Sequence, residues 1–236
     1  MKKTNPFSLT LLFLGAFISV SAQTTDEIVS KHIEAVGGKE NWTKVKSMRI
    51  EMTIKEEGNE VKIISTQIDR KAKRADISFT GMKGYSILTE KEGWEFMPFG
   101  GMTKPEPMTA EDIKIGQDDL QLQDEFITYK DLEKKLEYIG KDDVDGTECL
   151  KLKMTCKDAR ETTFYIDPAN YFVIKQVEKV KVNGQEEEST SMFSNYKKIE
   201  GGIFYPMSIL SDGANMEITK VEVNPTIDES IFSLPK

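Results

Sequence analysis

The chain contains a single histidine, His32, so it has little of the side chain that most often acts as a base in nucleophilic catalysis. Ser-His-Asp and Cys-His arrangements, and histidine-rich metal sites, would all have to use this one residue. His32 lies on the apolar face of a predicted helix, which favours a structural role. No glycine-rich phosphate loop follows a predicted strand, and no nucleophile-elbow motif is present. The sequence therefore predicts no catalytic site, no metal site and no cofactor, and the protein is not expected to be an enzyme.

Cysteine is also scarce, because Cys149 and Cys156 are the only two in the chain. Both fall in one predicted strand, seven positions apart, which corresponds to about 23 Å of extended chain. A disulfide requires Cα atoms about 4.4–6.8 Å apart. We therefore expect two free thiols, with Cys156 serving as a small buried apolar side chain.

No apolar run is long enough to cross a membrane. The most apolar stretch, residues 9–20, has twelve residues, whereas a spanning helix needs about 20. Lys2 and Lys3 precede it, and Val20-Ser21-Ala22 follows with the small-x-small pattern of a cleavage site. Residues 1–22 are thus predicted to be a cleaved signal peptide, which leaves residues 23–236 as a single soluble domain.

The sequence has fewer basic residues (32 Lys and Arg) than acidic residues (40 Asp and Glu). The formal net charge of the whole chain is −8, and removal of Lys2 and Lys3 takes it to −10. Such a surface disfavours nucleic acid and direct adhesion to anionic lipid headgroups. The balance of charge predicts no nucleic-acid partner.

The patterns that are present indicate a short helical start followed by strands. Thr24-x-x-Glu27 is typical of a capping box, Gly37-Gly38 ends the first helix, and a second short helix is expected at 41–45. From Met48 onward apolar and polar residues alternate, and turn residues punctuate the alternation, giving about eleven strands. One apolar face per strand indicates an antiparallel sheet.

Residues 98–135 interrupt the alternation. Pro105 and Pro107 predict a loop, and Thr109-x-x-Asp112 predicts the start of one or two short amphipathic helices. We expect this segment to be a helical lid over the concave side of the sheet. The predicted lid residues, chosen for their apolar character, are Met102, Met108, Ile113, Leu120, Leu122 and Phe126.

A series of phrases in the second half of the chain carries a family resemblance. The phrases are Phe164-Tyr165-Ile166-Asp167-Pro168, Phe193-Ser194-Asn195-Tyr196, Gly202-Ile203-Phe204-Tyr205-Pro206, Val221-Glu222-Val223-Asn224-Pro225 and Ile227-Asp228-Glu229-Ser230-Ile231-Phe232. With Gly93-Trp94-Glu95-Phe96 in the first half, their order resembles the outer-membrane lipoprotein carrier, or lipoprotein-sorting (LolA/LolB-like), superfamily. The resemblance covers about residues 45–235.

The resemblance implies a fold and a function. The fold is an unclosed antiparallel β-barrel with helices covering its concave side, mainly β with a helical lid. The function is that of a monomeric periplasmic carrier or chaperone, which shelters acyl chains of lipoproteins or other lipids between an inner-membrane exporter and an outer-membrane acceptor. The same fold also occurs in envelope-stress sensors that bind lipid or misfolded protein and regulate a membrane partner, which is the alternative. Carriers of this kind tether the lid with a strand arginine, and both Arg70 and Arg74 are candidates for that latch.

Apolar residues that recur at every second position next to turn residues predict which side chains form the cavity wall. We expect twelve side chains to share one concave, lipid-binding face: Met48, Ile50, Met52, Tyr85, Ile87, Trp94, Phe96, Leu150, Leu152, Met154, Phe164 and Ile166.

Overall fold

The computed structural model describes residues 24–56, 58–182 and 185–235. The predicted signal peptide, residues 1–22, lies outside the described residues. Within the described part of the chain, no helix has the length and apolar character to cross a membrane.

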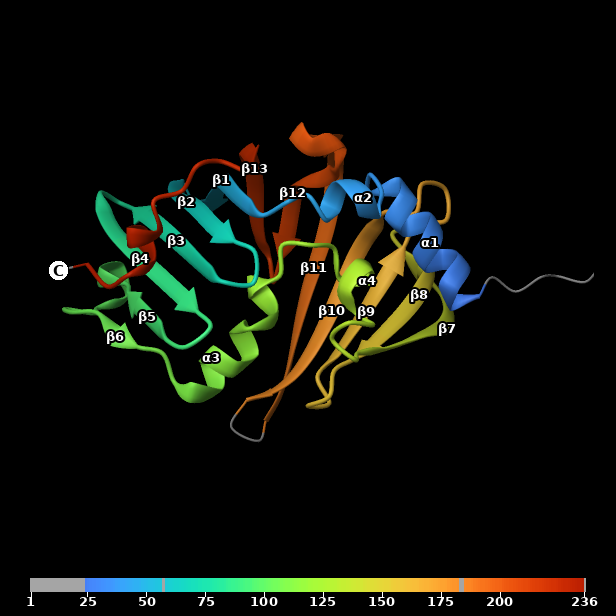
Figure 1. Cartoon of the computed structure of the whole chain (residues 1–236), viewed down its shortest axis with the longest axis horizontal. Helices are drawn as coiled ribbons and strands as arrows, with labels where there is room; N and C mark the ends of the chain where they lie inside the picture. Colours follow the sequence, from blue (N-terminus) through green and yellow to red (C-terminus); the bar gives the residue numbers. More distant parts are fainter. Residues whose placement is uncertain (1–23, 57, 183–184, 236) are drawn as a thin grey trace, which may run out of the picture.

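The strands of the described residues form one antiparallel sheet. Strands that follow one another in sequence are adjacent in the sheet, with the exception of β6 and β7. The sheet order is β6-β5-β4-β3-β2-β1-β13-β12-β11-β10-β9-β8-β7, so β1 and β13 join two meanders and β6 and β7 are the free edges (Figure 1). The strands are β1 (Ser47–Glu56), β2 (Asn59–Ile68), β3 (Ala72–Phe79), β4 (Met82–Thr89), β5 (Gly93–Phe96), β6 (Glu106–Pro107), β7 (Lys135–Val144), β8 (Thr147–Thr155), β9 (Glu161–Ile166), β10 (Val173–Val182), β11 (Gln185–Lys198), β12 (Phe204–Ser211) and β13 (Ala214–Val223). The expected unclosed antiparallel sheet is confirmed, with thirteen strands in place of about eleven.

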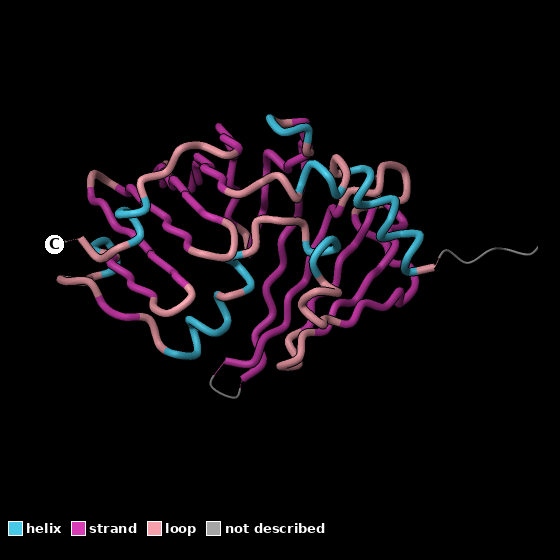
Figure 2. Tube along the Cα trace, viewed as in Figure 1, coloured by secondary structure: helices cyan, strands magenta, loops and turns pink. Residues whose placement is uncertain are grey.

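The four α-helices of the described residues lie on one side of this curved sheet, and we call that side the inner face (Figure 2). They are α1 (Thr25–Ala35), α2 (Lys39–Trp42), α3 (Ala110–Gly116) and α4 (Glu125–Thr128). The capping box predicted at Thr24 and the helix start predicted at Thr109 are both confirmed, since each hydroxyl accepts a hydrogen bond from the backbone N–H three residues later. The second helix starts two residues earlier than the predicted 41–45, because Gly38 with φ of 86° turns the chain directly into it.

Tight turns hold the hairpins in register. Asp145 and Gly146 join β7 to β8 with φ of 51° and 87°, and Asp212 and Gly213 join β12 to β13 with φ of 47° and 89°. Two successive positive φ values are typical of type I′ turns, whose twist matches that of the strands they connect. Asp-Gly pairs adopt this geometry at low cost, and these two-residue turns fix which residues of the connected strands pair.

Two buried clusters fill the inner face. The first packs Ile28 and Val29 of α1 and Phe126 of α4 on β8 and β9. The second packs Trp42 and Val45 on β1 and β13. The first cluster seals the β8–β9 end of the sheet under α1 and α4, and the second covers the middle of the sheet at β1 and β13.

A third buried cluster lies on the opposite, outer face. There the segment after β13 crosses β3 and β4, and Phe232 packs on Ala72 and Ile87. The Arg74 guanidinium holds the segment by donating to the Ile231 carbonyl oxygen at 2.8 Å. Both faces of this half of the sheet are therefore covered by other parts of the chain.

The two thiols are free, as expected. Cys149 is buried within β8, and Cys156 lies one residue beyond the end of that strand. Burial raises the pKa of the Cys149 thiol to about 11, which disfavours the reactive thiolate.

The packing of α1 and α4 on β8 predicts a large cost for removing a central side chain. Leu152 is 0% exposed in that cluster, and a buried Leu→Ala change costs about 2–5 kcal/mol. We expect Leu152→Ala to lower the midpoint of thermal unfolding by roughly 5–15 °C. The matched control is Leu210→Ala, at a side chain 44% exposed, which should change the free energy of unfolding by about 0.5 kcal/mol or less. Equal shifts in the two variants would contradict this assignment of the core.

Candidate functional site

A cavity of about 520 Å³ lies between the lid segment and the inner face of the sheet. Its floor includes Met48 and Ile50 of β1, Phe193 of β11 and Tyr205 of β12, and its roof includes Leu122. The volume lies within the about 300–1,000 Å³ that is usual for small-molecule sites, which combine apolar walls with a few polar groups.

A second chamber of about 270 Å³ adjoins the first, beneath α1 and α2. The two chambers share five lining residues: Leu122, Gln123, Glu125, Phe193 and Tyr205. Residues 122–125 therefore stand where the chambers meet, and we call this place the waist. Beyond the waist the wall is rich in aromatic rings, including Trp42 and Phe126.

The prediction that twelve apolar residues share one face is wrong for four of them. Residues directly opposite in an antiparallel pair lie on the same face, and the register runs without a shift from β1 to β5. Arg49, Thr66, Arg74, Ile87 and Trp94 consequently share the outer face. The four outward residues are Tyr85, Ile87, Trp94 and Phe96. They are apolar because the C-terminal segment covers part of the outer face, where it packs on Tyr85 and Ile87.

The other eight predicted residues lie on the inner face, but few of them border open space. Met48, Ile50 and Phe164 line the chambers, and Met52 is half-buried against the second core cluster. The remaining four are packed under α1 and α4: Leu150, Leu152, Met154 and Ile166.

The predicted lid residues divide in the same way. Leu122 lines both chambers, Phe126 lines the smaller one, and Leu120 is buried at the end of the 3₁₀ turn Asp118–Leu120. Ile113 is half-buried in α3. Met102 and Met108 belong to the sheet edge, because Glu106–Pro107 pairs with β5 as β6 and the Met108 N–H donates to the Gly93 carbonyl oxygen.

The two candidate latch arginines have separate surroundings. The Arg70 Nε donates to Gln121 Oε1 at 3.1 Å, and its backbone N–H donates to the Leu120 carbonyl oxygen at 2.7 Å. Arg74 lies on the outer face, bound to Asp76 and Ile231. Arg70 therefore contacts the lid segment, whereas Arg74 contacts the C-terminal segment.

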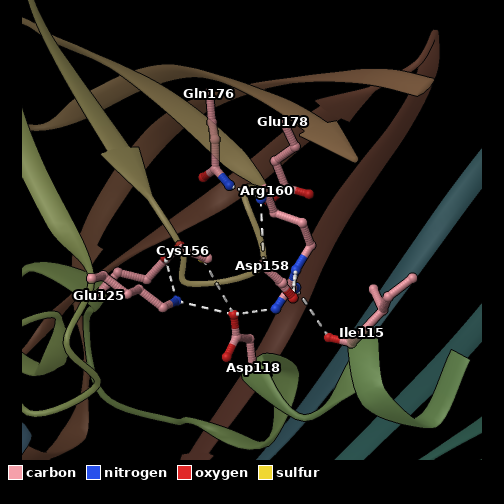
Figure 3. Close-up of polar contacts among 9 residues, drawn as sticks. Ile115, Asp118, Glu125, Cys156, Asp158, Arg160, Gln176 and Glu178 are labelled. Atoms are coloured by element: carbon pink, nitrogen blue, oxygen red, sulfur yellow. Dashed lines mark hydrogen bonds and ion pairs between the residues drawn. The ribbon is translucent and has the colours of Figure 1, made fainter. Parts of the chain in front are cut away.

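On the opposite wall, a cluster of charged groups joins the lid to the turn between β8 and β9 (Figure 3). Asp118 lies 3.1 Å from Arg160 Nη2 and 3.1 Å from Lys134 Nζ. Arg160 also donates to the Ile115 carbonyl oxygen at 3.3 Å and to Asp158 at 2.9 Å. Polar contacts thus join the lid to the turn before β3 on one side and to the turn between β8 and β9 on the other.

Two carboxyl groups in the cavity have perturbed ionisation. Burial among protein atoms raises the pKa of Glu125 to about 7; Lys134 opposes the shift, and nearby carboxylates add to it. The Glu125 side chain is 40% exposed, because it borders the open space of the cavity. Burial also raises the pKa of Glu178, against the hydrogen bond from Gln176.

His32 has the structural role that its position predicts. It is 1% exposed, its Nδ1 donates to the Tyr171 carbonyl oxygen at 2.7 Å, and its Nε2 lies 3.0 Å from Asp124 Oδ2. Burial alone would lower the pKa of His32, but the Asp124 carboxylate outweighs it and raises the pKa. Because Asp124 also caps α4, His32 ties α1 to the base of the lid.

Sequence reasoning missed the charged wall and much of the cavity floor. Phe193 and Tyr205 stand in phrases that carried the family resemblance, but spacing alone does not show that they border a cavity. Arg160 and Lys134 gave no signal, because charged residues next to turns are usually solvated. Across the described ranges, no group of three or more His, Cys, Asp or Glu is arranged to hold a metal ion.

The raised pKa of Glu125 predicts a pH-dependent stability. The folded state binds this proton more tightly than the unfolded chain, whose pKa is near 4.5. Its contribution is therefore fully favourable below pH 4.5 and is lost as the pH rises to about 7. Glu125→Gln stays neutral, so its free energy of unfolding relative to the native protein should rise between these pH values and then level off. Urea unfolding at pH 4.5, 6 and 8 measures this difference. Glu137→Gln, at an exposed edge carboxyl, is the control, and a flat difference for Glu125→Gln would contradict the assignment.

No family model and no curated protein matches the sequence. Solved structures do match. A LolA superfamily protein from Nitrosomonas europaea has 13% identity and a TM-score of 0.57, covering 90% of this chain and 99% of its own. A DUF1329 family protein from Desulfovibrio piger has 13% identity and a TM-score of 0.55, with coverage of 90% and 98%.

A third similar structure is a putative outer membrane lipoprotein-sorting protein domain from Vibrio parahaemolyticus. It has 13% identity and a TM-score of 0.51, covering 87% of this chain and 94% of that domain. At 13% identity, these structural likenesses show the fold alone. The fold that the sequence resemblance implies is therefore confirmed, and the chain has the open-sheet fold seen in these three structures.

Proposed function

We propose that this protein is a non-enzymatic carrier or chaperone that shelters acyl chains of lipoproteins, or of another lipid, on their way across the periplasm to the outer membrane. The observation that carries the proposal is the cavity between lid and sheet, in a fold shared with a LolA superfamily protein and a lipoprotein-sorting domain. An exposed acyl chain costs about 0.8 kcal/mol per CH₂ in water. A protein that covers such a chain lowers the barrier to its transfer.

In this proposal the chambers receive the chain and the lid controls access. Met48, Ile50, Leu122, Phe164 and Phe193 supply apolar walls. The apolar side chains of β8 and β9 that α1 and α4 cover provide additional apolar surface for a longer acyl chain. Arg70 on one wall and Arg160 on the other hold the closed lid.

Charged groups in the larger chamber distinguish it from a plain hydrocarbon pocket. Lys134 and Arg160 balance some of the carboxyl groups there, and Glu125 keeps its proton up to about pH 7. Such a chamber receives the polar end of an amphiphile more readily than the end of its chain. The aromatic chamber beyond the waist has the opposite character. Together they favour one orientation of a bound lipid, with its polar end toward the charged wall.

The movable part of the lid is the stretch from α3 to Leu122. Phe126 of α4 is anchored, because its ring lies 4.7 Å from that of His32 and 4.8 Å from that of Phe164. The stretch before the waist is joined to the sheet by the polar contacts of Arg70 and Asp118 and by the buried side chain of Leu120.

Native mass spectrometry of the protein purified from its own cells tests the proposal directly. We expect a fraction of the protein to carry a co-purified acyl lipid, and the purified protein to bind a pyrene-labelled acyl probe. Absence of both would contradict the carrier function.

Locking the lid should abolish binding. The Cys156 Sγ lies 3.9 Å from Asp118 Oδ2, so Asp118→Cys places a second thiol opposite the native one. After oxidation, verified by the loss of both thiols, uptake of the acyl probe should fall at least about tenfold, because the lid can no longer leave the sheet. Reduction should restore it.

The matched control for this experiment is Asp118→Cys combined with Cys156→Ser. It loses the same carboxylate but cannot form the crosslink, so its uptake should not respond to oxidation. Equal uptake by the locked and reduced proteins would rule out a moving lid.

A further inference from the structure

The waist of the cavity contains an amide side chain for which the described residues supply no hydrogen-bond partner. Gln123 is 8% exposed and lines both chambers. Throughout the described ranges, no unpartnered side-chain nitrogen or oxygen is fully enclosed, so the remaining exposure of the Gln123 amide is to the cavity. The amide is therefore open to whatever fills the cavity, and a ligand that displaces water there keeps its affinity only if it replaces the hydrogen bonds of that water.

A phenol lies at the same place. Tyr205 of β12 also lines both chambers, and its hydroxyl hydrogen-bonds to none of the described residues. Burial raises the pKa of Tyr205 to about 12, so the hydroxyl is neutral and able to donate. Lid and sheet thus each bring one neutral hydrogen-bonding group to the waist.

The residues around Gln123 and Tyr205 indicate what kind of ligand group these two side chains could bind. Leu122 and Phe193 give the waist apolar sides, so an alkyl chain can pass through it into the aromatic chamber. Each cation that lines the larger chamber is already paired with a carboxylate: Lys73 with Asp119, Lys134 and Arg160 with Asp118, and Lys179 with Glu188. These pairings leave little positive charge for a phosphate or a free carboxylate. A neutral acceptor attached to an alkyl chain meets both conditions.

We propose that the waist is a subsite for the carbonyl group that links an acyl chain to the rest of a lipid as an ester or amide, with Gln123 and Tyr205 donating hydrogen bonds to it. This inference rests on the proposed acyl-binding function and adds a specific ligand group to it. The subsite fixes the depth to which the chain enters, because the carbonyl stops where its partners are. It gives an otherwise unselective apolar cavity a preference for acylated molecules over plain hydrocarbon.

Three pyrene probes of equal length test the subsite: an alkyl ester, an alkyl amide and an alkane without a carbonyl. Each is titrated by fluorescence against the full mature protein and against Gln123→Met and Tyr205→Phe, which keep the side-chain size. We expect each substitution to weaken binding of the ester or amide probe by about two- to tenfold, the usual worth of one neutral hydrogen bond. Binding of the alkane should not change. An effect on the ester alone or the amide alone identifies the linkage that the protein carries.

The outcomes separate this inference from the function on which it rests. If the native protein binds all three probes and neither variant discriminates among them, the subsite is refuted and the carrier function stands. If the native protein binds none of the probes, the subsite is refuted, and the carrier function is refuted with it when no acyl lipid co-purifies. Equal loss for ester, amide and alkane would show that the variants disturb packing, and it would also refute the subsite. Because Gln123 lies on the lid and Tyr205 on the sheet, misfolding of one variant leaves the other as the test.

Discussion

Antiparallel pairing runs through all thirteen strands, but the two edge strands β6 and β7 lie at opposite ends of the sheet order. An inner face that does not meet itself must be covered by something else, because exposed apolar surface is unfavourable. At the β7–β9 end, α1 and α4 pack closely on the strands. Beside this packed end, the larger chamber lies between the inner face of the sheet and residues 115–134.

The way the lid is attached suits a part that must move. Its base is fixed by apolar packing of α4 and by the buried contact between His32 and Asp124. Its outer part is joined to the sheet by Arg70 on one side and by Asp118 on the other. Apolar packing resists opening, whereas polar contacts that border the cavity can be exchanged for hydrogen bonds to water. The base therefore acts as an anchor while the outer part opens.

Local structure and fold class could be predicted from the amino-acid sequence. Capping boxes at Thr24 and Thr109, Asp-Gly turns and period-two alternation depend on neighbouring residues, so the order of residues along the chain is enough to predict them. The family phrases added the open sheet and the lid. What alternation cannot decide is which side of a strand faces the cavity, since both faces carry apolar residues where a second layer covers the sheet.

The composition of the site depends instead on tertiary contacts. Ile87 and Trp94 alternate as regularly as Met48 and Ile50, yet the register places them on the outer face, where the segment ending at Phe232 packs on Ile87. Arg70 and Arg74 are four residues apart, and they contact different segments because Arg70 lies in the turn before β3 and Arg74 points outward from that strand. The waist is lined by both Gln123 and Tyr205, which are 82 positions apart in the sequence. Contacts of that separation arise from the closure of the lid on the sheet, which no local pattern encodes.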